Sequence, residues 1–181
     1  MKKIIFLCLV FFIIFNFSPT IYSQQQELPP ELEIPEGFVF YHYQYAYIDI
    51  SLVYPENWIN HSSQERGIMI YTPDSKGTLI FWANPLFGKE YTLAELWAEN
   101  MESLKLAGAT FFESVPDKLS GHPAIRALHT IKIGKDTHKY IRYNSIIGDL
   151  FYSFSFNTQE AEFRKYLNDV IKIVRSIKIN L

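Results

Sequence analysis

Hydrophobic and polar residues alternate in several short stretches of this 181-residue chain, which is the pattern of β-strands that bury one face. The clearest stretch is 47–54, where four apolar side chains share one face: Ile48, Ile50, Leu52 and Tyr54. The same reasoning predicts further strands at 38–45, 67–72, 78–83, 110–115, 124–133, 139–147 and 150–156. Short polar turns separate the last three, which predicts that they form an antiparallel meander.

Two other segments repeat hydrophobic residues every three or four positions, which predicts amphipathic helices. The first begins with Thr92 and Glu95, which have the spacing of a capping box, and it ends at Gly108. The second is expected to have Asn157 or Thr158 as its N-cap. Its apolar stripe contains Phe163, Tyr166, Leu167, Val170, Ile171 and Val174. Strands, a helix, more strands and a second helix predict an α+β domain.

Some of the predicted strands are apolar on both faces, as in 124–133, where Ile125 and Leu128 point to opposite sides. A helix on each face of the sheet would bury both sets of side chains. We therefore expect an antiparallel β-sheet with helices packed on both faces, a three-layer α/β/α sandwich. Three apolar residues should then lie in the core: Ile50, Trp97 and Val174.

Segment 1–23 has the composition of a signal peptide, with two lysines, an apolar run at 4–15 and a more polar end at Ser23. The apolar run is shorter than the roughly 20 residues that a transmembrane helix needs, so cleavage after Ser23 is favoured over an uncleaved anchor. Segment 24–36 is rich in proline and glutamate and is expected to be a flexible linker to a domain at 37–181. We therefore expect a secreted or periplasmic protein that has no stable membrane span after cleavage.

Charge and cysteine content narrow the function classes further. The chain has 17 Lys and Arg against 19 Asp and Glu, a net charge of −2, and the part after the two lysines of the predicted signal peptide has a net charge of −4. A mildly acidic domain lacks the basic surface that binding to DNA or RNA requires, so no nucleic-acid partner is expected. The only cysteine is Cys8, so no disulfide is expected in the secreted part.

Four short motifs occur in order along the predicted domain. They are Tyr54-Pro55-Glu56-Asn57-Trp58 after a strand, Leu119-Ser120-Gly121-His122-Pro123-Ala124 at a turn, Tyr152-x-Phe154-x-Phe156 in a late strand, and Ser176-Ile177 after the last helix. Together they resemble the motifs of the Mog1/PsbP-like superfamily. The resemblance covers 47–179, nearly the whole predicted domain.

This resemblance implies an antiparallel sheet between helices and a binding or assembly role without catalysis. The superfamily includes a photosystem II extrinsic subunit, a Ran-binding nuclear protein and many exported bacterial proteins. The predicted signal peptide makes the exported bacterial members the nearest analogues. No motif aligns this chain with the metal-binding residues of the photosystem subunit, so the resemblance implies no metal ligands here.

No motif in the chain specifies a reaction. H-E-x-x-H, C-x-x-C, G-x-S-x-G, G-x-G-x-x-G and P-loop patterns are all absent from the sequence. Asp136 and His138 are expected in a solvated turn, and His129, on an apolar strand face, is expected to be buried and hydrogen-bonded. We therefore predict no catalytic, cofactor-binding or metal-binding residues. A hydrolase with a composite site is the least favoured alternative.

Aromatic residues make up 17% of the chain, which is the feature most relevant to binding. One interpretation is that they fill the core, and the other is that some form an exposed contact surface, because Tyr and Trp are favoured at interfaces. The candidates for such a surface are Tyr41, Tyr43, Trp58, Trp82 and Phe87. For Trp58, the tryptophan of the YPENW turn, core packing is favoured over a place in a ligand groove.

These observations favour an exported, non-catalytic binding or assembly-accessory module. Its partner is expected to be an unidentified protein of the envelope or the extracellular space. The alternative is a carrier or sensor that holds a small apolar ligand between a helix and the sheet.

Overall fold

The computed structural model describes residues 33–46, 48–64 and 67–180. The predicted signal peptide (1–23) and most of the predicted linker (24–36) lie outside the described residues. Those two segment assignments therefore stay predictions, as does cleavage after Ser23.

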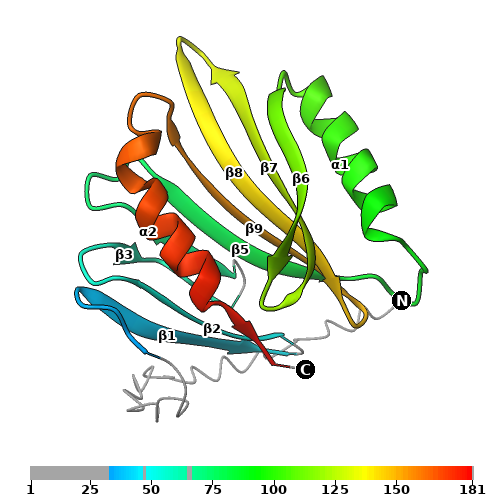
Figure 1. Ribbon diagram of the computed structural model, residues 1–181, viewed down its shortest axis with the longest axis horizontal. Helices are drawn as coiled ribbons and strands as arrows, with labels where there is room; N and C mark the ends of the chain where they lie inside the picture. The colour runs from blue at the N-terminus through cyan, green and yellow to red at the C-terminus, as the bar shows by residue number, and fades with distance from the viewer. Residues whose placement is uncertain (1–32, 47, 65–66, 181) are drawn as a thin grey trace, which may run out of the picture.

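A seven-stranded antiparallel sheet forms the larger part of the domain (Figure 1). Its strands are β3 (Ile59–Asn60), β4 (Ile68–Tyr71), β5 (Thr78–Pro85), β6 (Thr110–Leu119), β7 (His122–Ile133), β8 (Asp136–Ile147) and β9 (Leu150–Gln159). The strand order is β3-β4-β5-β9-β8-β7-β6, so the predicted meander is confirmed.

The chain forms a second, smaller sheet that the alternation pattern did not separate from the first. It contains β1 (Phe38–Tyr45), β2 (Ile48–Pro55) and β10 (Lys178–Ile179), in the order β1-β2-β10. Only two residues of β10 pair, Lys178 with Ser51 and Ile179 with Ile50. A strand this short has no detectable alternation, because the period of a strand needs several residues to become visible.

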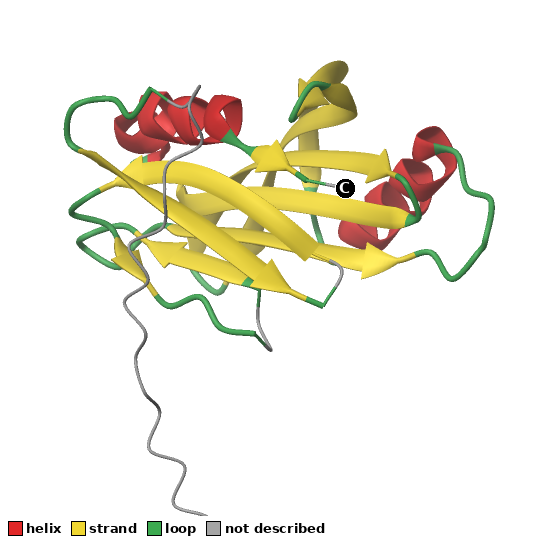
Figure 2. Ribbon diagram, turned by 90° about the horizontal axis from the view of Figure 1, so that it is seen from below, coloured by secondary structure: helices red, strands yellow, loops and turns green. Residues whose placement is uncertain are grey.

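The core lies between the large sheet and a layer made of helix α2 (Phe163–Ser176) and the small sheet (Figures 1 and 2). Tyr152, Phe154 and Phe156 of β9 are fully buried, which explains the Y-x-F-x-F motif. The rings of Phe156 and Tyr166 lie 6.2 Å apart, so the inner face of β9 packs directly on α2.

Helix α1 (Leu93–Leu106) lies beside β6, β7 and β8 at one end of the large sheet (Figure 1). Trp97, the buried residue of this helix, contacts Phe111 at a ring distance of 5.9 Å, and Phe111 is paired with His129 across β6 and β7. Successive side chains of a strand point to opposite faces, so His129 lies on the face opposite to Leu128, which pairs with Ile141 on the core side. Trp97 of α1 therefore packs on the side of the sheet that carries Phe111.

The predicted antiparallel sheet and the two predicted helices are confirmed. The three-layer α/β/α sandwich is not confirmed, because the chain has only two helices among the described residues and forms a second sheet, and α1 lies at one end of the large sheet. The expected burial of Ile50, Trp97 and Val174 is confirmed, with exposed fractions of 1%, 5% and 6%. None of the helices in the described residues has the length and hydrophobicity to span a membrane.

Of the two predicted helix N-caps, one is confirmed and one is wrong. The capping box of α1 is confirmed: the Glu95 N–H donates to the Thr92 hydroxyl, and the Thr92 N–H donates to the Glu95 carboxylate at 2.8 Å. The expected N-cap of α2 is wrong, because Asn157 and Thr158 continue β9 and pair with β8, and α2 begins only after Glu162. Sheet pairing satisfies the backbone groups that a helix cap would otherwise need.

Candidate functional site

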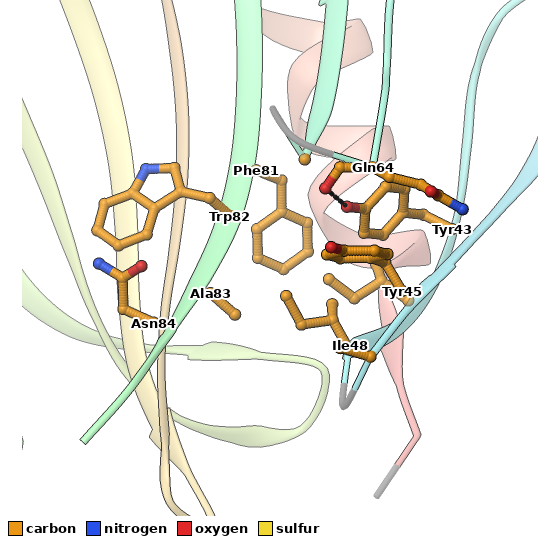
Figure 3. A pocket seen from close by; sticks show the side chains of 11 residues that line it. Tyr43, Tyr45, Ile48, Gln64, Phe81, Trp82, Ala83 and Asn84 are labelled. Atoms are coloured by element: carbon orange, nitrogen blue, oxygen red, sulfur yellow. Dashed lines mark hydrogen bonds between the residues drawn. The ribbon is translucent and has the colours of Figure 1, made fainter. Parts of the chain in front are cut away.

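A cleft opens between the tip of the β1–β2 hairpin and strand β5 (Figure 3). Its volume is about 230 Å³. We call it the aromatic cleft, and its main lining residues are Tyr43, Tyr45, Ile48, Ile50, Phe81 and Ala83.

The hairpin register places the aromatic residues of β1 on one face. Tyr43 lies opposite Ile50 and Tyr45 opposite Ile48, so all four side chains face the same side of the small sheet. Ala46 follows with a φ of 52°, a left-handed conformation that makes the turn at the hairpin tip. Burial decreases toward this tip, since Tyr43 is 6% exposed and Tyr45 is 43% exposed.

The polar groups of the aromatic cleft are few. The Tyr43 hydroxyl donates to the backbone carbonyls of Gln64, at 3.3 Å, and Ser63, at 3.4 Å, and these bonds connect the hairpin to the loop before β4. Burial raises the pKa of Tyr43, and the neighbouring Tyr41 and Tyr45 raise it further. The phenol is therefore neutral at physiological pH and can act only as a hydrogen-bonding group.

Among its described lining residues, the aromatic cleft offers only the phenols of Tyr43 and Tyr45 for acid–base chemistry. Among the described residues that line it, none carries a carboxylate, an imidazole, an ammonium or a guanidinium group. What the geometry provides is an apolar, aromatic hollow with a half-exposed tyrosine at its edge. Such a site can bury an apolar or aromatic group.

The residues predicted as one interaction surface lie in separate places. Of the five, Tyr43 and Trp82 are among the residues that line the aromatic cleft, but Figure 3 shows the Trp82 side chain on the opposite side of β5 from Phe81. Tyr41 contacts Tyr54 at a ring distance of 6.2 Å. Phe87 is 85% exposed in the loop after β5.

Trp58 is buried, so it is not available to an exposed surface, and the preferred interpretation of core packing agrees with the structure. Its side chain is 5% exposed and contacts the rings of Phe156 and Tyr166 at 5.7 and 5.8 Å. The turn that positions it is closed by a hydrogen bond from the Trp58 N–H to the Pro55 carbonyl at 2.9 Å. The YPENW motif is therefore a turn that returns a large ring to the core.

Sequence reasoning missed Ile48 as a residue of the site, and the five candidate residues also left out Tyr45 and Phe81. Alternation correctly placed Ile48 on the apolar face of its strand, and the odd-numbered tyrosines of β1 share one face for the same reason. That signal identifies which residues point together, but Phe81 comes from the other sheet. The contact between the two sheets is a tertiary feature.

His129 is buried as expected, but the expected hydrogen bonds are absent. Neither ring nitrogen has a hydrogen-bond partner among the residues that the structure describes. The imidazole is stacked between Phe111 and Tyr140, with ring centroids 5.0 and 4.8 Å away. Burial lowers the pKa of His129 to about 4, and the charge of Arg142 acts in the same direction. His129 is therefore neutral at physiological pH and packs as an aromatic ring.

No group of three or more His, Cys, Asp or Glu side chains that could hold a metal ion occurs within residues 33–46, 48–64 and 67–180. His42 lies 2.8 Å from Asp49, on the β1–β2 hairpin. Asp49 also accepts a hydrogen bond from the Asn180 side chain at 2.8 Å, so its carboxylate joins the C-terminal segment to this hairpin. The pair contributes to structure.

Comparison with known proteins identifies the fold of the chain but not its function. No protein-family model matches the chain, and no curated protein matches it in sequence. Several solved structures align with most of it. The cyanobacterial PsbP protein CyanoP of Synechocystis sp. PCC 6803 is 10% identical, with a TM-score of 0.61 over 84% of this chain and 100% of its own. LpqN of Mycobacterium tuberculosis, described as involved in cell envelope biogenesis, is 12% identical, with a TM-score of 0.63 over 80% of this chain and 92% of its own.

The chain has a Mog1/PsbP-like fold. This confirms the resemblance that the four sequence motifs indicated. At identities of 10% and 12% the likeness concerns the fold alone, so the role of the aromatic cleft depends on its own geometry.

Proposed function

We propose that this chain is an exported, non-catalytic binding module that receives an apolar side chain of a protein partner in the aromatic cleft. The observation that carries the proposal is the gradient along β1, from buried Tyr43 to half-exposed Tyr45, beside an open apolar hollow. A tyrosine that is held by its strand at the edge of a hollow has little conformational freedom to lose on binding. Such residues are frequent binding hot spots.

The size of the aromatic cleft favours a side chain over a free small molecule. Pockets for drug-sized ligands usually have roughly 300–1,000 Å³, and the cleft has about 230 Å³. This volume accommodates one aromatic or branched aliphatic side chain. The cleft also lies between two sheets, whereas the alternative of an apolar-ligand carrier placed its ligand between a helix and the sheet.

The charges of the lining residues further limit the chemical class of the partner's contacting group. The described lining residues carry no formal charge, and burial keeps the Tyr43 hydroxyl neutral. A charged guest would lose its hydration without gaining an ion pair with any of these described residues, which is unfavourable. The contacting group of the partner is therefore apolar, with a neutral hydrogen-bonding group at most.

Export is supported by the predicted signal peptide at 1–23 and by one of the structural neighbours. LpqN is described as involved in cell envelope biogenesis, which is consistent with a Mog1/PsbP-like domain that works outside the cytoplasm. A secreted or periplasmic location places the partner in the envelope or the extracellular space.

Site-specific photo-crosslinking tests this proposal. A photoreactive phenylalanine analogue replaces Tyr45 in the full-length chain, which is expressed in its own host cell, and adducts are identified by mass spectrometry. The same analogue at Leu106, which is 86% exposed on α1, is the control for random encounters. We expect a defined protein adduct at position 45 and none at position 106.

A second pair of variants tests whether the aromatic cleft itself is required. Ile48→Asp places a charge beside position 45 and should abolish the adduct, while Ile133→Asp makes the same chemical change at a residue that is 52% exposed elsewhere. An adduct that survives Ile48→Asp, or equal adducts at positions 45 and 106, would refute the proposal. A small molecule bound to the purified protein in native mass spectrometry, without any protein adduct, would favour the carrier alternative.

A further inference from the structure

A second groove lies between the tip of the β6–β7 hairpin and the C-terminal end of α2, and it shares no lining residue with the aromatic cleft. Its volume is about 470 Å³. We call it the basic groove. Its lining residues include Lys118, Arg126, Tyr143, Val174, Arg175 and Lys178.

The two walls of the basic groove are held together by a hydrogen bond. The Ile179 N–H of β10 donates to the Ser120 hydroxyl at the hairpin tip, at 2.9 Å. Ser120 and Gly121 have φ values of 51° and 80°, so the hairpin turns in the left-handed region and its tip lies against the C-terminal segment (Figure 1). The groove is therefore built from segments that are fixed to one another.

Positive charge concentrates in this groove although the chain as a whole is mildly acidic. Its lining contains two lysines and two arginines but a single carboxylate, Asp117. Arg126 is neutralised in part, because it forms ion pairs with Glu113 and, at 3.1 Å, with Asp117. Three further cations have no ion pair with any described residue: Lys118, Arg175 and Lys178.

The floor of the basic groove is apolar except for one phenol. Val174 is 6% exposed and Tyr143 is 5% exposed, and the Tyr143 hydroxyl has no hydrogen bond to another described residue. Burial and Asp117 raise the pKa of Tyr143, while Arg126 and Arg175 oppose that rise. Both guanidinium groups thus lie close enough to the phenol to influence it, and a neutral phenol can donate a hydrogen bond to an anion beside them.

We propose that the basic groove binds a phosphate group, held by Arg175, Lys178 and Lys118 above the hydroxyl of Tyr143. Arginine and lysine together suit a phosphate, since the guanidinium offers a fork of donors and the ammonium a compact charge. The recognition chemistry is the same for the phosphate of a lipid headgroup and for that of a soluble ligand. This site is separate from the aromatic cleft and does not depend on the proposed protein partner.

Binding of inorganic pyrophosphate and of phosphatidylglycerol vesicles to the purified protein tests the proposal. The test variant is the double substitution Arg175→Gln and Lys178→Gln. The matched control is Lys105→Gln with Lys132→Gln, which removes the same charge from two exposed lysines outside the groove. We expect about tenfold weaker binding in the test variant and unchanged binding in the control, because charge-assisted hydrogen bonds are roughly twice as strong as neutral ones.

The two probes separate the sources of the phosphate. Pyrophosphate binding that depends on the groove residues supports a soluble ligand, and vesicle binding with the same dependence supports a lipid headgroup. Equal weakening in both double variants would mean non-specific attraction and would overturn the proposal. Absence of binding to both probes at low ionic strength would overturn it as well.

Tyr143→Phe supplies a readout that a charge effect cannot mimic. This variant keeps the ring and every formal charge, and removes only the hydroxyl. We expect a two- to tenfold loss of pyrophosphate affinity, as roughly one hydrogen bond is worth. Unchanged affinity would exclude the phenol from the site and contradict the proposed geometry.

Discussion

The ring of Trp58 stacks on the ring of Phe156, with centroids 5.7 Å apart and planes inclined by 29°. Trp58 belongs to the turn after β2, and Phe156 to β9 at the centre of the large sheet. The contact thus joins the small sheet to the large one. Tyr166 of α2 meets the edge of the same indole, so three elements share this ring.

Removal of this indole should destabilise the whole domain. We expect Trp58→Ala to lower the free energy of unfolding by about 3–5 kcal/mol, the usual loss for a large aromatic side chain in a core. Urea denaturation followed by circular dichroism measures the change. Phe87→Ala, at a residue that is 85% exposed, is the control and should stay within about 0.5 kcal/mol of the wild type. A Trp58→Ala protein of unchanged stability would contradict the packing described here.

His129 should make stability depend on pH in a defined window. Its pKa is about 4 in the folded state against an ordinary value of 6.5, so between these values the unfolded chain binds a proton that the folded chain does not. Stability therefore falls as the pH is lowered from 6.5 to 4, by at most about 3 kcal/mol from this residue. We expect His129→Phe to flatten the melting temperature over this window.

His129→Phe also keeps the aromatic stack with Phe111 and Tyr140 and removes two buried nitrogens that lack partners. The variant should thus be at least as stable as the wild type at pH 7. His61→Phe, the same substitution at an exposed histidine, is the control for the loss of an imidazole. A wild-type profile that is flat between pH 4 and 6.5 would argue against the burial of a neutral imidazole.

Asp74 fixes α2 to the turn between β4 and β5. Its carboxylate accepts hydrogen bonds from the Thr72 hydroxyl and the Tyr166 hydroxyl, both at 2.7 Å, and from the Lys76 N–H at 3.1 Å. These bonds, with that from Thr72 the largest cause, hold the pKa of Asp74 well below its ordinary value, although burial opposes the shift. The stabilisation by charged Asp74 is thus complete above roughly pH 4 and is lost as the pH falls further.

We expect Asp74→Asn to cost about 1–2 kcal/mol at pH 7, near the low end for hydrogen bonds to a charged group because the carboxylate is partly solvated. The cost should shrink below pH 4, where the carboxyl of the unfolded chain begins to bind a proton that the folded chain does not bind. Thermal melts between pH 2 and 7 measure both effects, with Asp149→Asn in the exposed β8–β9 turn as control. An Asp74→Asn cost that is the same at pH 2 and pH 7 would contradict the role of the charge.

Ser176, the serine of the Ser176-Ile177 motif, connects the end of α2 to β2 through its hydroxyl group. Its hydroxyl accepts a hydrogen bond from the Val53 N–H at 2.9 Å and donates to the Ile173 carbonyl at 2.7 Å. Val53 is 1% exposed, so Ser176→Ala leaves a buried N–H without a partner, at a cost of about 1–3 kcal/mol. Ser103→Ala, which removes an exposed hydroxyl that donates to the Glu99 carbonyl, is the matched control. Equal losses in the two variants, measured by denaturation, would rule out a special role for the bond to Val53.

Some features were predictable because they depend on neighbouring residues. Thr92 and Glu95 are three positions apart, and their reciprocal hydrogen bonds form within one helical turn. The alternation at 150–156 predicted a common face for Tyr152, Phe154 and Phe156, because the geometry of a strand alone sets that face. For the same reason the tyrosines of β1 could be placed on one side of their strand.

Other features required contacts between distant segments. Asn157 and Thr158 have the composition of a helix cap but extend β9, because their backbone groups find partners in β8. The predicted aromatic surface divided in the same way: Trp58 entered the core, while the Trp82 side chain lies on the opposite side of β5 from Phe81. Periodicity predicts which side chains share a face of a strand, but it does not predict which element that face packs against.

The sequence by itself determined eight of the ten described strands, the two helices, the first helix cap and the α+β class, since each follows from local geometry and periodic burial. The tertiary structure alone decided that the strands divide into two sheets, and that a cleft and a groove form where distant segments meet. The physical reason is that a binding hollow is made of residues from several elements, and its shape is set by how these elements pack. Tyr45 and Phe81, or Lys118 and Arg175, become neighbours only once the chain has folded.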